Sequence, residues 1–491
     1  MGKRLLKLLM WAMLAMIILA AVVLARTFML PKEKGGEPVP QAKLIDVDAG
    51  ALAQNLSTAI QFKTVTMQNR EDTDWHVFLE FQGWLLETYP DFYGLVDSEQ
   101  VETYAQLHVW KGSDPSLDPI VFLAHQDVVP ASVDDGGWDY PPFDGTIADG
   151  FIYGRGAIDD KGSLIAILEA SDRLAASGFA PKRTLIFGFG HDEEVAGSGA
   201  KAIAEILKAR DIRPYAVIDE GGAILTGMTV PGQMASIGVA EKGYLTLVLT
   251  AKARGGHSST PPTYTAIGAL SKAIAKLEAS PFENGRDEVM TAMLKATAPR
   301  MPFKQRMAIA NLWLFGGMVE NKLRSVDITR AMMGTSIAPT IIDAGFKENA
   351  LPREATAYVN FRIHSRDSIE SVTAHVRGVI DDPNIEISVS DNIGSEPSPV
   401  SQIDSGPYLW IKDVVQSTFP EAIIAPNTVV GGTDSRYFAI VTDDIYRFAP
   451  YVFDGSDIKR IHGLNERMDV QAFAKAVQVY YLMLEKAGDG G

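Results

Sequence analysis

The chain has 491 residues, more than a single compact core usually holds, so we expect two domains together with additional segments. Its formal net charge of −16 argues against a nucleic-acid partner. The sequence contains no cysteine, which excludes disulfides, thiolate nucleophiles and cysteine-ligated metals. Any metal site must therefore use His, Asp and Glu side chains.

The N-terminus predicts a helix that crosses a membrane. Three basic residues among the first seven precede an uncharged stretch at 8–25, whose length approaches the roughly 20 apolar residues that span a bilayer. We predict that residues 1–30 form an uncleaved signal anchor, with the later residues outside the cytoplasm, in the periplasm, at the cell exterior or in a lumen. Secretion after cleavage is the alternative, because Val-Leu-Ala near the end of the stretch resembles a cleavage site. Residues 31–47, which mix Pro, Gly, Lys and Glu, are predicted to be a linker.

Beyond the linker, apolar runs alternate with helical patterns. The runs at 119–129, 183–190 and 215–218 are typical of strands that are buried on both faces. Helical spacing at 162–176 and 199–209 places helices between these strands. Strands that alternate with helices predict a mostly parallel sheet covered on both sides, with polar motifs at the carboxyl ends of the strands.

The pattern changes in the middle of the chain. Residues 243–394 follow the order strand, helix, strand, strand, helix, strand, which predicts a ferredoxin-like unit. A Met-rich helical pattern at 283–333 interrupts this unit as an insert. The α/β pattern then returns over 395–491, so we predict that 48–242 and 395–491 form one domain into which the other is inserted.

Two polar motifs follow predicted strands at positions suited to binding a metal. His125 ends the first apolar run, and Asp127 can accept a hydrogen bond from the other ring N–H and fix its tautomer. Asp159 lies in a glycine-rich turn, where its two carboxylate oxygens could bridge two metals. Taken singly, His125 would more often be a structural histidine, and an aspartate of that turn could instead cap the following helix.

Two glutamates, Glu193 and Glu194, stand side by side after the 183–190 run. Neighbouring carboxylates directed at one cavity repel, and a nearby divalent cation is the natural way to keep both ionised. One of them could then bind metal while the other takes a proton from a metal-bound water. In isolation, a solvated acidic turn would be the favoured explanation of the pair.

Taken together, these motifs resemble the dinuclear zinc family of aminoacylase, carboxypeptidase G and succinyl-diaminopimelate desuccinylase. The resemblance runs from about residue 48 to the C-terminus, and it is nearest to the branch of carboxypeptidase S and N-fatty-acyl-amino-acid hydrolase. It implies an α/β zinc-peptidase catalytic domain, with a mostly parallel sheet covered by helices, and an inserted α+β ferredoxin-like lid domain. The motifs are Leu-Ala-His-Gln-Asp at 123–127, Gly-Arg-Gly-Ala-Ile-Asp-Asp-Lys-Gly at 154–162, Asp-Glu-Glu at 192–194, Gly-Gly-His-Ser at 255–258 and Gly-Gly-Thr-Asp at 431–434.

The resemblance implies two zinc ions per subunit, with cobalt or manganese as possible substitutes. Asp159 would bridge the ions, Glu193 would be the general base, and Asp127 would polarise His125. For the fifth ligand we choose Asp219 over its neighbour Glu220, because Asp219 falls directly at the end of a strand. The complete set of implied ligands is His125, Asp159, Glu194, Asp219 and His462.

The resemblance also implies groups that hold the substrate. His257 would steady the oxyanion of the tetrahedral intermediate, often from a partner subunit, although its Gly-Gly-His-Ser segment could simply be a helix-capping turn. Asn349 and Arg362 would grip the substrate's carboxylate, a task suited to the two-pronged guanidinium. Gly432 and Thr433 would add backbone N–H and hydroxyl contacts near the same carboxylate.

We therefore expect a metal-dependent hydrolase that cleaves the amide bond of peptides or N-acyl amino acids with a free C-terminal carboxylate. One alternative is a deacylase for a specific small metabolite, resembling aminoacylase or the desuccinylase. Another is a non-catalytic, membrane-tethered peptide-binding relative. A homodimer formed through the lid domain is a possible assembly, and the acyl group is not specified by the sequence.

Overall fold

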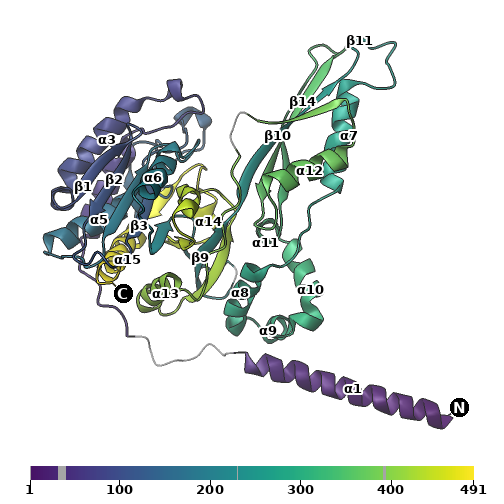
Figure 1. Cartoon of the computed structure of the whole chain (residues 1–491), viewed down its shortest axis with the longest axis horizontal. Coiled ribbons are helices and arrows are strands. Elements are labelled where there is room, and N and C mark those ends of the chain that lie inside the picture. The colour runs from purple at the N-terminus through teal and green to yellow at the C-terminus, as the bar shows by residue number, and fades with distance from the viewer. Residues whose placement is uncertain (1, 31–39, 229, 391–393, 491) are drawn as a thin grey trace.

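The computed structural model describes residues 2–30, 40–228, 230–390 and 394–490. Residues 31–39 of the predicted linker and 391–393 at the end of the predicted lid lie outside the described residues. Helix α1 (Gly2–Met29) begins the chain and projects away from the remainder of the molecule (Figure 1). It is the one helix in the described part that is long and apolar enough to cross a membrane, a test that a signal sequence also passes.

A ten-stranded mixed sheet forms the centre of the α/β domain. The pairs β6–β3, β3–β7 and β7–β17 are parallel, and antiparallel pairs lie toward the two edges. The central strands are therefore parallel, as the sequence predicts. The strands of the ten-stranded sheet, in spatial order, are β1 (Asp97–Val101), β2 (Ala105–Trp110), β6 (Leu185–Gly190), β3 (Ile120–His125), β7 (Ala216–Asp219), β17 (Ile445–Arg447), β9 (Gln233–Glu241), β8 (Ile224–Thr226) and β18 (Val452–Phe453), with β16 (Ile423–Val429) beside β9.

Helices cover both faces of this sheet. Strand β3 shows why, because Phe122 and Ala124 belong to one hydrophobic core while Val121 and Leu123 belong to the other. Successive side chains of a strand point to opposite faces, so an uninterrupted apolar run needs a cover on each side. The first core is covered by α2 (Ala49–Gln61), α3 (Trp75–Thr88), α5 (Lys161–Ala176), α13 (Gly406–Thr418) and α15 (Val470–Gly488), and the second by α6 (Ser198–Ala209) and the 3-10 helix η4 (Asp434–Ile440).

The lid is a four-stranded antiparallel sheet with two helices packed on one face (Figure 1). In β14, buried residues alternate with half-buried or exposed ones, as expected of a sheet with a single covered face. Spatial order and element order together are those of a ferredoxin-like unit. In chain order the elements are β10 (Gly243–Lys252), α7 (Ala266–Ala279), β12 (Ser336–Ala344), β14 (Glu354–Ile363), α12 (Ile369–Ile380) and β15 (Ile385–Val389).

Four short helices occupy the chain between α7 and β12, and we call them the helical insert. Met290 and Met293 of the insert pack with Met234 of β9 and Ala425 of β16 in a hydrophobic cluster of their own. The insert therefore rests on the α/β domain although it branches from the lid. Its helices are α8 (Glu288–Thr297), α9 (Phe303–Ala310), α10 (Leu312–Arg324) and α11 (Asp327–Met332).

Small elements complete the two domains. A two-stranded ribbon marks the tip of the lid, and a three-stranded sheet lies beside α2. The ribbon consists of β11 (Gly256–His257) and β13 (Ala350–Leu351), the small sheet of β4 (Ile147–Ala148), β5 (Phe151–Tyr153) and β19 (Arg467–Asp469), and the remaining short helices are α4 (Pro90–Tyr93) and α14 (Gly455–Ile458).

Candidate metal centre

The candidate site lies at the carboxyl ends of three adjacent parallel strands. His125 is the last residue of β3, Asp219 is the last residue of β7, and Glu193 and Glu194 follow β6. Because β6, β3 and β7 run parallel and side by side, their carboxyl ends share one edge of the sheet. The topology thus brings together residues of these three strand ends that are distant in sequence, His125 and Asp219 being 94 positions apart.

Asp159 stands between two imidazoles, one facing each of its carboxylate oxygens. The Nε2 atom of His125 lies 3.0 Å from Oδ1 of Asp159, and the Nε2 atom of His462 lies 3.1 Å from Oδ2. Glu194 completes the second group, with Oε2 3.0 Å from Nε2 of His462. Ligand atoms of His125, Asp159 and Glu194 all fall within 4.8 Å of one another. Imidazole and carboxylate donors of this kind suit a divalent cation.

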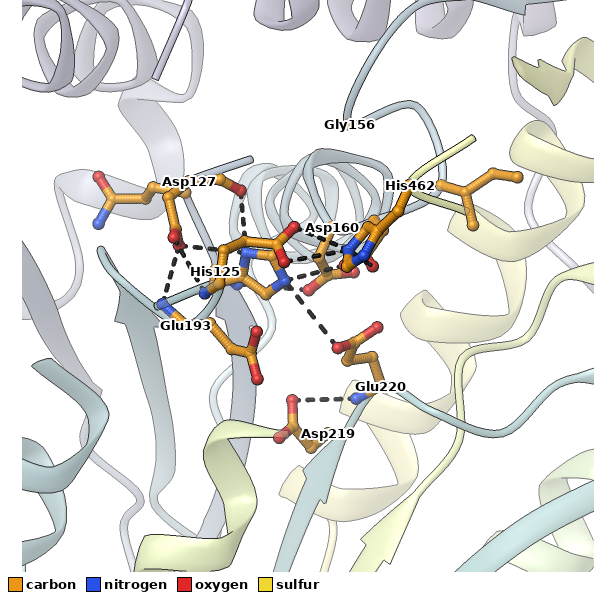
Figure 2. Close-up of polar contacts among 12 residues, drawn as sticks. His125, Asp127, Gly156, Asp160, Glu193, Asp219, Glu220 and His462 are labelled. Carbon is orange, nitrogen blue, oxygen red and sulfur yellow. Dashed lines mark hydrogen bonds and ion pairs between the residues drawn. The ribbon is translucent and has the colours of Figure 1, made fainter. Parts of the chain in front are cut away.

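The structure distinguishes Glu220 from its neighbour Asp219. Oδ2 of Asp219 accepts a hydrogen bond of 2.7 Å from the backbone N–H of Ser435, and Oδ1 accepts one of 2.9 Å from the N–H of Glu220. Glu220 instead turns toward the imidazoles, and its Oε1 lies 3.9 Å from Nε2 of His125 (Figure 2). Adjacent residues of an extended segment point to opposite sides. The side chain of Asp219, the shorter of the two, holds the first turn of η4 through its hydrogen bond from Ser435. In this geometry Glu220 faces His125 and Asp219 does not, and the choice of Asp219 as the fifth ligand stays a prediction.

Asp127 fixes the local structure around His125. Its Oδ1 and Oδ2 accept hydrogen bonds of 3.1 Å from the backbone N–H groups of Glu193 and Glu194, and Oδ2 accepts another of 2.7 Å from the Thr66 hydroxyl. Oδ1 also lies 3.3 Å from Nδ1 of His125. Burial acts to raise the pKa of Asp127, yet these hydrogen bonds hold it below its ordinary value. The carboxylate therefore orients the acidic turn, and the backbone oxygen of Asp127, 3.0 Å from Nδ1 of His125, joins it in orienting the imidazole.

The remaining carboxylates are crowded and largely shielded from water. Burial, together with neighbouring acids, raises the pKa of Glu193, Glu194 and Glu220. For Asp159, burial also acts upward, but the hydrogen bonds from His125 and His462 leave its pKa below its ordinary value. Hydrogen bonds to Asp159 and Glu194 raise the pKa of His462 to about 10. Such a concentration of buried negative charge is a physical setting in which divalent cations bind.

Arg436 is a neighbour of this centre that sequence reasoning missed. Its Nη1 lies 3.5 Å from Oε1 of Glu193 and donates a hydrogen bond of 3.0 Å to the backbone oxygen of Thr433. Burial lowers the pKa of Arg436, but the carboxylate of Glu193 more than offsets this and raises it above its ordinary value. The sequence places Arg436 two residues after the Gly-Gly-Thr-Asp motif, and this position alone does not indicate an ion pair with Glu193.

Of the predicted substrate-binding groups, Arg362, Gly432 and Thr433 lie near the centre. Arg362 lies on β14 near the base of the lid, and its guanidinium carbon is 4.9 Å from the centroid of the Tyr244 ring. Its guanidinium also interacts electrostatically with the carboxylate of Glu193. The Thr433 hydroxyl donates 2.8 Å to Oε2 of the buried Glu241. That hydroxyl is therefore already engaged within the protein.

His257 and Asn349 lie elsewhere in the same chain. Both are exposed at the tip of the lid, where the backbone N–H of Ser258 donates 3.2 Å to the oxygen of Asn349. Figure 1 shows β11, which contains His257, at the far end of the lid from β3 and the other strands of the site. Within one chain the structure therefore keeps His257 and Asn349 apart from the candidate metal ligands.

The chain is similar to known proteins over most of its length. Residues 121–486 match the family described as peptidase family M20/M25/M40. The chain belongs to this family. It is 36% identical over 441 residues to probable carboxypeptidase S-like 2 of Dictyostelium discoideum, covering 88% of this chain and 84% of that protein. It is 38% identical over 447 residues to the N-fatty-acyl-amino acid synthase/hydrolase PM20D1 of Homo sapiens, covering 89% of this chain and 88% of that protein.

Solved structures share the fold. The M20 family metallo-carboxypeptidase Sso-CP2 from Sulfolobus solfataricus aligns with a TM-score of 0.68 at 16% identity, over 89% of this chain and 99% of that one. Human carnosine dipeptidase 1 aligns with a TM-score of 0.66 at 17% identity, over 90% of this chain and 96% of that one. As the sequence predicts, this M20 member has an α/β fold and is a metal-dependent hydrolase of amide bonds in peptides or N-acyl amino acids.

Proposed function

We propose that this M20 hydrolase uses two zinc ions to cleave N-acyl amino acids that carry a free carboxylate, the acyl group being a long apolar chain. The observation that carries the dinuclear part is the placement of Asp159, whose two oxygens face His125 and His462 separately. The acyl preference is supported by the name and the 38% identity of the human relative. The carboxylate requirement is supported by Arg362, a guanidinium within electrostatic reach of Glu193.

We assign His125, Asp159 and Glu220 to one ion, and Asp159, Glu194 and His462 to the other. When bound, the ions would supply Lewis acidity and activate a water molecule near neutral pH. Glu193 would take the proton of that water and deliver it to the departing amine. Its position beside the ligand Glu194, and a pKa raised by burial, suit a group that must both accept and release a proton.

The tip of the lid has a proposed role in a dimer. Because His257 and Asn349 are exposed and remote from the strand ends of their own chain, we propose that they serve the site of a second copy. There His257 would donate a hydrogen bond to the oxyanion, and Asn349 would join Arg362 at the carboxylate. This assignment makes the homodimer part of the proposed function.

Removing the guanidinium of Arg362 tests how the substrate carboxylate is bound. Arg362→Ala should reduce kcat/KM for an N-acyl amino acid about 10- to 100-fold, because a charge-assisted hydrogen bond to a carboxylate is worth roughly 1.5–3 kcal/mol. The same variant should hydrolyse the corresponding amino acid amide at the wild-type rate. Arg353→Ala, at an exposed position on the same lid, is the matched control. Equal losses on both substrates would refute a carboxylate contact.

The N-terminal helix is proposed to be a signal anchor that leaves the hydrolase outside the cytoplasm. In cells with a permeable outer envelope, added protease should digest the hydrolase domain while the membrane stays intact. The full chain should remain in the membrane fraction after an alkaline wash, and a chain lacking residues 1–30 should not. A protected domain would overturn the orientation, and a mature N-terminus beginning near Arg26 would show cleavage instead.

A further inference from the structure

The C-terminal end of α1 is attached to the helical insert. Val23 and Thr27 are buried, whereas most of α1 is exposed. The side-chain amide of Asn311, between α9 and α10, donates 3.1 Å to the backbone oxygen of Val23 and 3.3 Å to the hydroxyl of Thr27. Arg306 of α9 donates 3.2 Å to the backbone oxygen of Thr27. These contacts join segments that are 279 to 288 residues apart.

An aromatic pair and a surrounding cluster reinforce the attachment. The rings of Phe28 in α1 and Phe303 in α9 lie 6.1 Å apart, centroid to centroid. Leu30 packs against the same hydrophobic cluster that ties α8 to β9 and β16. In Figure 1 the end of α1 nearest the body meets α9, and its N-terminus points away. The insert is therefore packed against both the end of α1 and the α/β domain.

The position of this contact along α1 determines its depth in a membrane. The uncharged stretch 8–25 spans about 27 Å at 1.5 Å per residue, close to the roughly 30 Å hydrocarbon core of a bilayer. The contacts at Val23, Thr27 and Phe28 thus fall where the core meets the headgroups. If α1 crosses the bilayer, α9 and the start of α10 must lie at that same level.

Exposed apolar side chains lie at this level, beside the Phe28–Phe303 pair. We call Phe303, Trp313, Leu314 and Met318 the insert face, and each is between 42% and 59% exposed. Three of them recur on one side of α10 at positions i, i+1 and i+5, while Gly316 on the other side is buried. A helix packed on a soluble core alone would normally expose polar residues there. Aromatic and aliphatic side chains at this depth are typical of membrane-interface helices.

We propose that the insert face lies in the outer interface of the bilayer that α1 crosses, with lipid as its partner. This inference rests on the proposed anchor and extends it, because α1 alone would give the hydrolase a single point of contact with the membrane. Continuity with the α1 contact favours lipid over a separate protein partner. The contact is apolar and the chain carries a net charge of −16, so zwitterionic phosphatidylcholine, which has no net charge, should suffice.

Single-cysteine labelling of the full chain tests the proposal, since the natural sequence has no cysteine. Trp313→Cys and Met318→Cys would each carry an environment-sensitive fluorophore, in phosphatidylcholine nanodiscs with and without a nitroxide-bearing lipid. Met16→Cys, exposed on α1, reports the anchor, and Phe346→Cys, exposed on the lid, reports a site away from the insert. Retained hydrolysis of an N-acyl amino acid shows that each variant is folded.

The labels at 313 and 318 should lose about half of their fluorescence to the nitroxide lipid, because interfacial helices sit about 5–10 Å deep, while the label at 346 should lose almost none. Quenching at 16 but not at 313 or 318 would overturn the membrane contact and leave the anchor standing. No quenching at 16 would contradict the anchor, and the proposal with it. Protection of 313 and 318 from lipid together with cross-linking between copies would assign the face to a second copy instead.

Discussion

Glu193→Gln is expected to reduce turnover about 10²- to 10⁴-fold while the fold and the bound metal are kept, because the substitution removes only the proton transfer. The backbone N–H of Glu193, which donates to Asp127, is unchanged by the substitution, and an amide has nearly the volume of the carboxylate. The variant should therefore melt near the wild-type temperature. Steady-state hydrolysis of an N-acyl amino acid and metal analysis of the same sample measure both parts of the prediction.

A control substitution separates the role of Glu193 from a general effect of lost charge. Glu205→Gln changes an exposed residue of α6 on the same domain and should leave turnover unaltered. If Glu193→Gln stays within about tenfold of the wild type, another group must carry the proton.

Glu220→Gln should lose one of two metal equivalents and most of the activity, whereas Asp219→Asn should keep both metals. The reason is geometric, because the carboxylate of Glu220 faces His125 while that of Asp219 accepts from Ser435 and Glu220. Loss of the charged acceptor at Asp219 should instead lower the free energy of unfolding by about 1–2 kcal/mol, the usual cost of weakening a helix cap. Metal analysis after dialysis and thermal unfolding distinguish the two effects.

The opposite pattern would restore Asp219 as the metal ligand. If Asp219→Asn lost a metal equivalent and Glu220→Gln kept both, then the hydrogen bond from Ser435 to Asp219 would have to yield to a metal bond. Neither outcome bears on His462 and Glu194, whose contacts with each other and with the shared Asp159 involve neither acid. The two substitutions therefore test one position without disturbing the rest of the site.

The central sheet could be predicted because the pattern of apolar residues that marks each strand lies within the strand itself. Short uninterrupted apolar runs such as β3 and β6 are typical of strands buried on both faces, and parallel strands place their carboxyl ends at one edge. The same regularity brought His125, Glu193 and Glu194 into one candidate site. The alternation in β14 likewise marks a sheet with one covered face, so the lid followed from the same reasoning.

Other features could not be predicted because they depend on distant parts of the chain. Asp219 and Glu220 are adjacent acids, and what distinguishes their surroundings is the hydrogen bond that Asp219 accepts from Ser435, 216 residues away. The pairing of Arg436 with Glu193 spans 243 residues. Neither the separation of His257 from the strand ends nor the attachment of α1 to Asn311 has a local signature, since both are set by how domains pack.

The most direct test of the dinuclear site is a metal titration of the full-length chain in detergent micelles. After removal of metal with a chelator, Zn²⁺ is restored in steps while bound metal and hydrolysis of an N-acyl amino acid are measured on the same samples. Activity should be absent at the start and should rise until two equivalents are bound, because both groups around Asp159 are needed. Full activity in the metal-free chain, or saturation at a single equivalent, would contradict a two-metal mechanism.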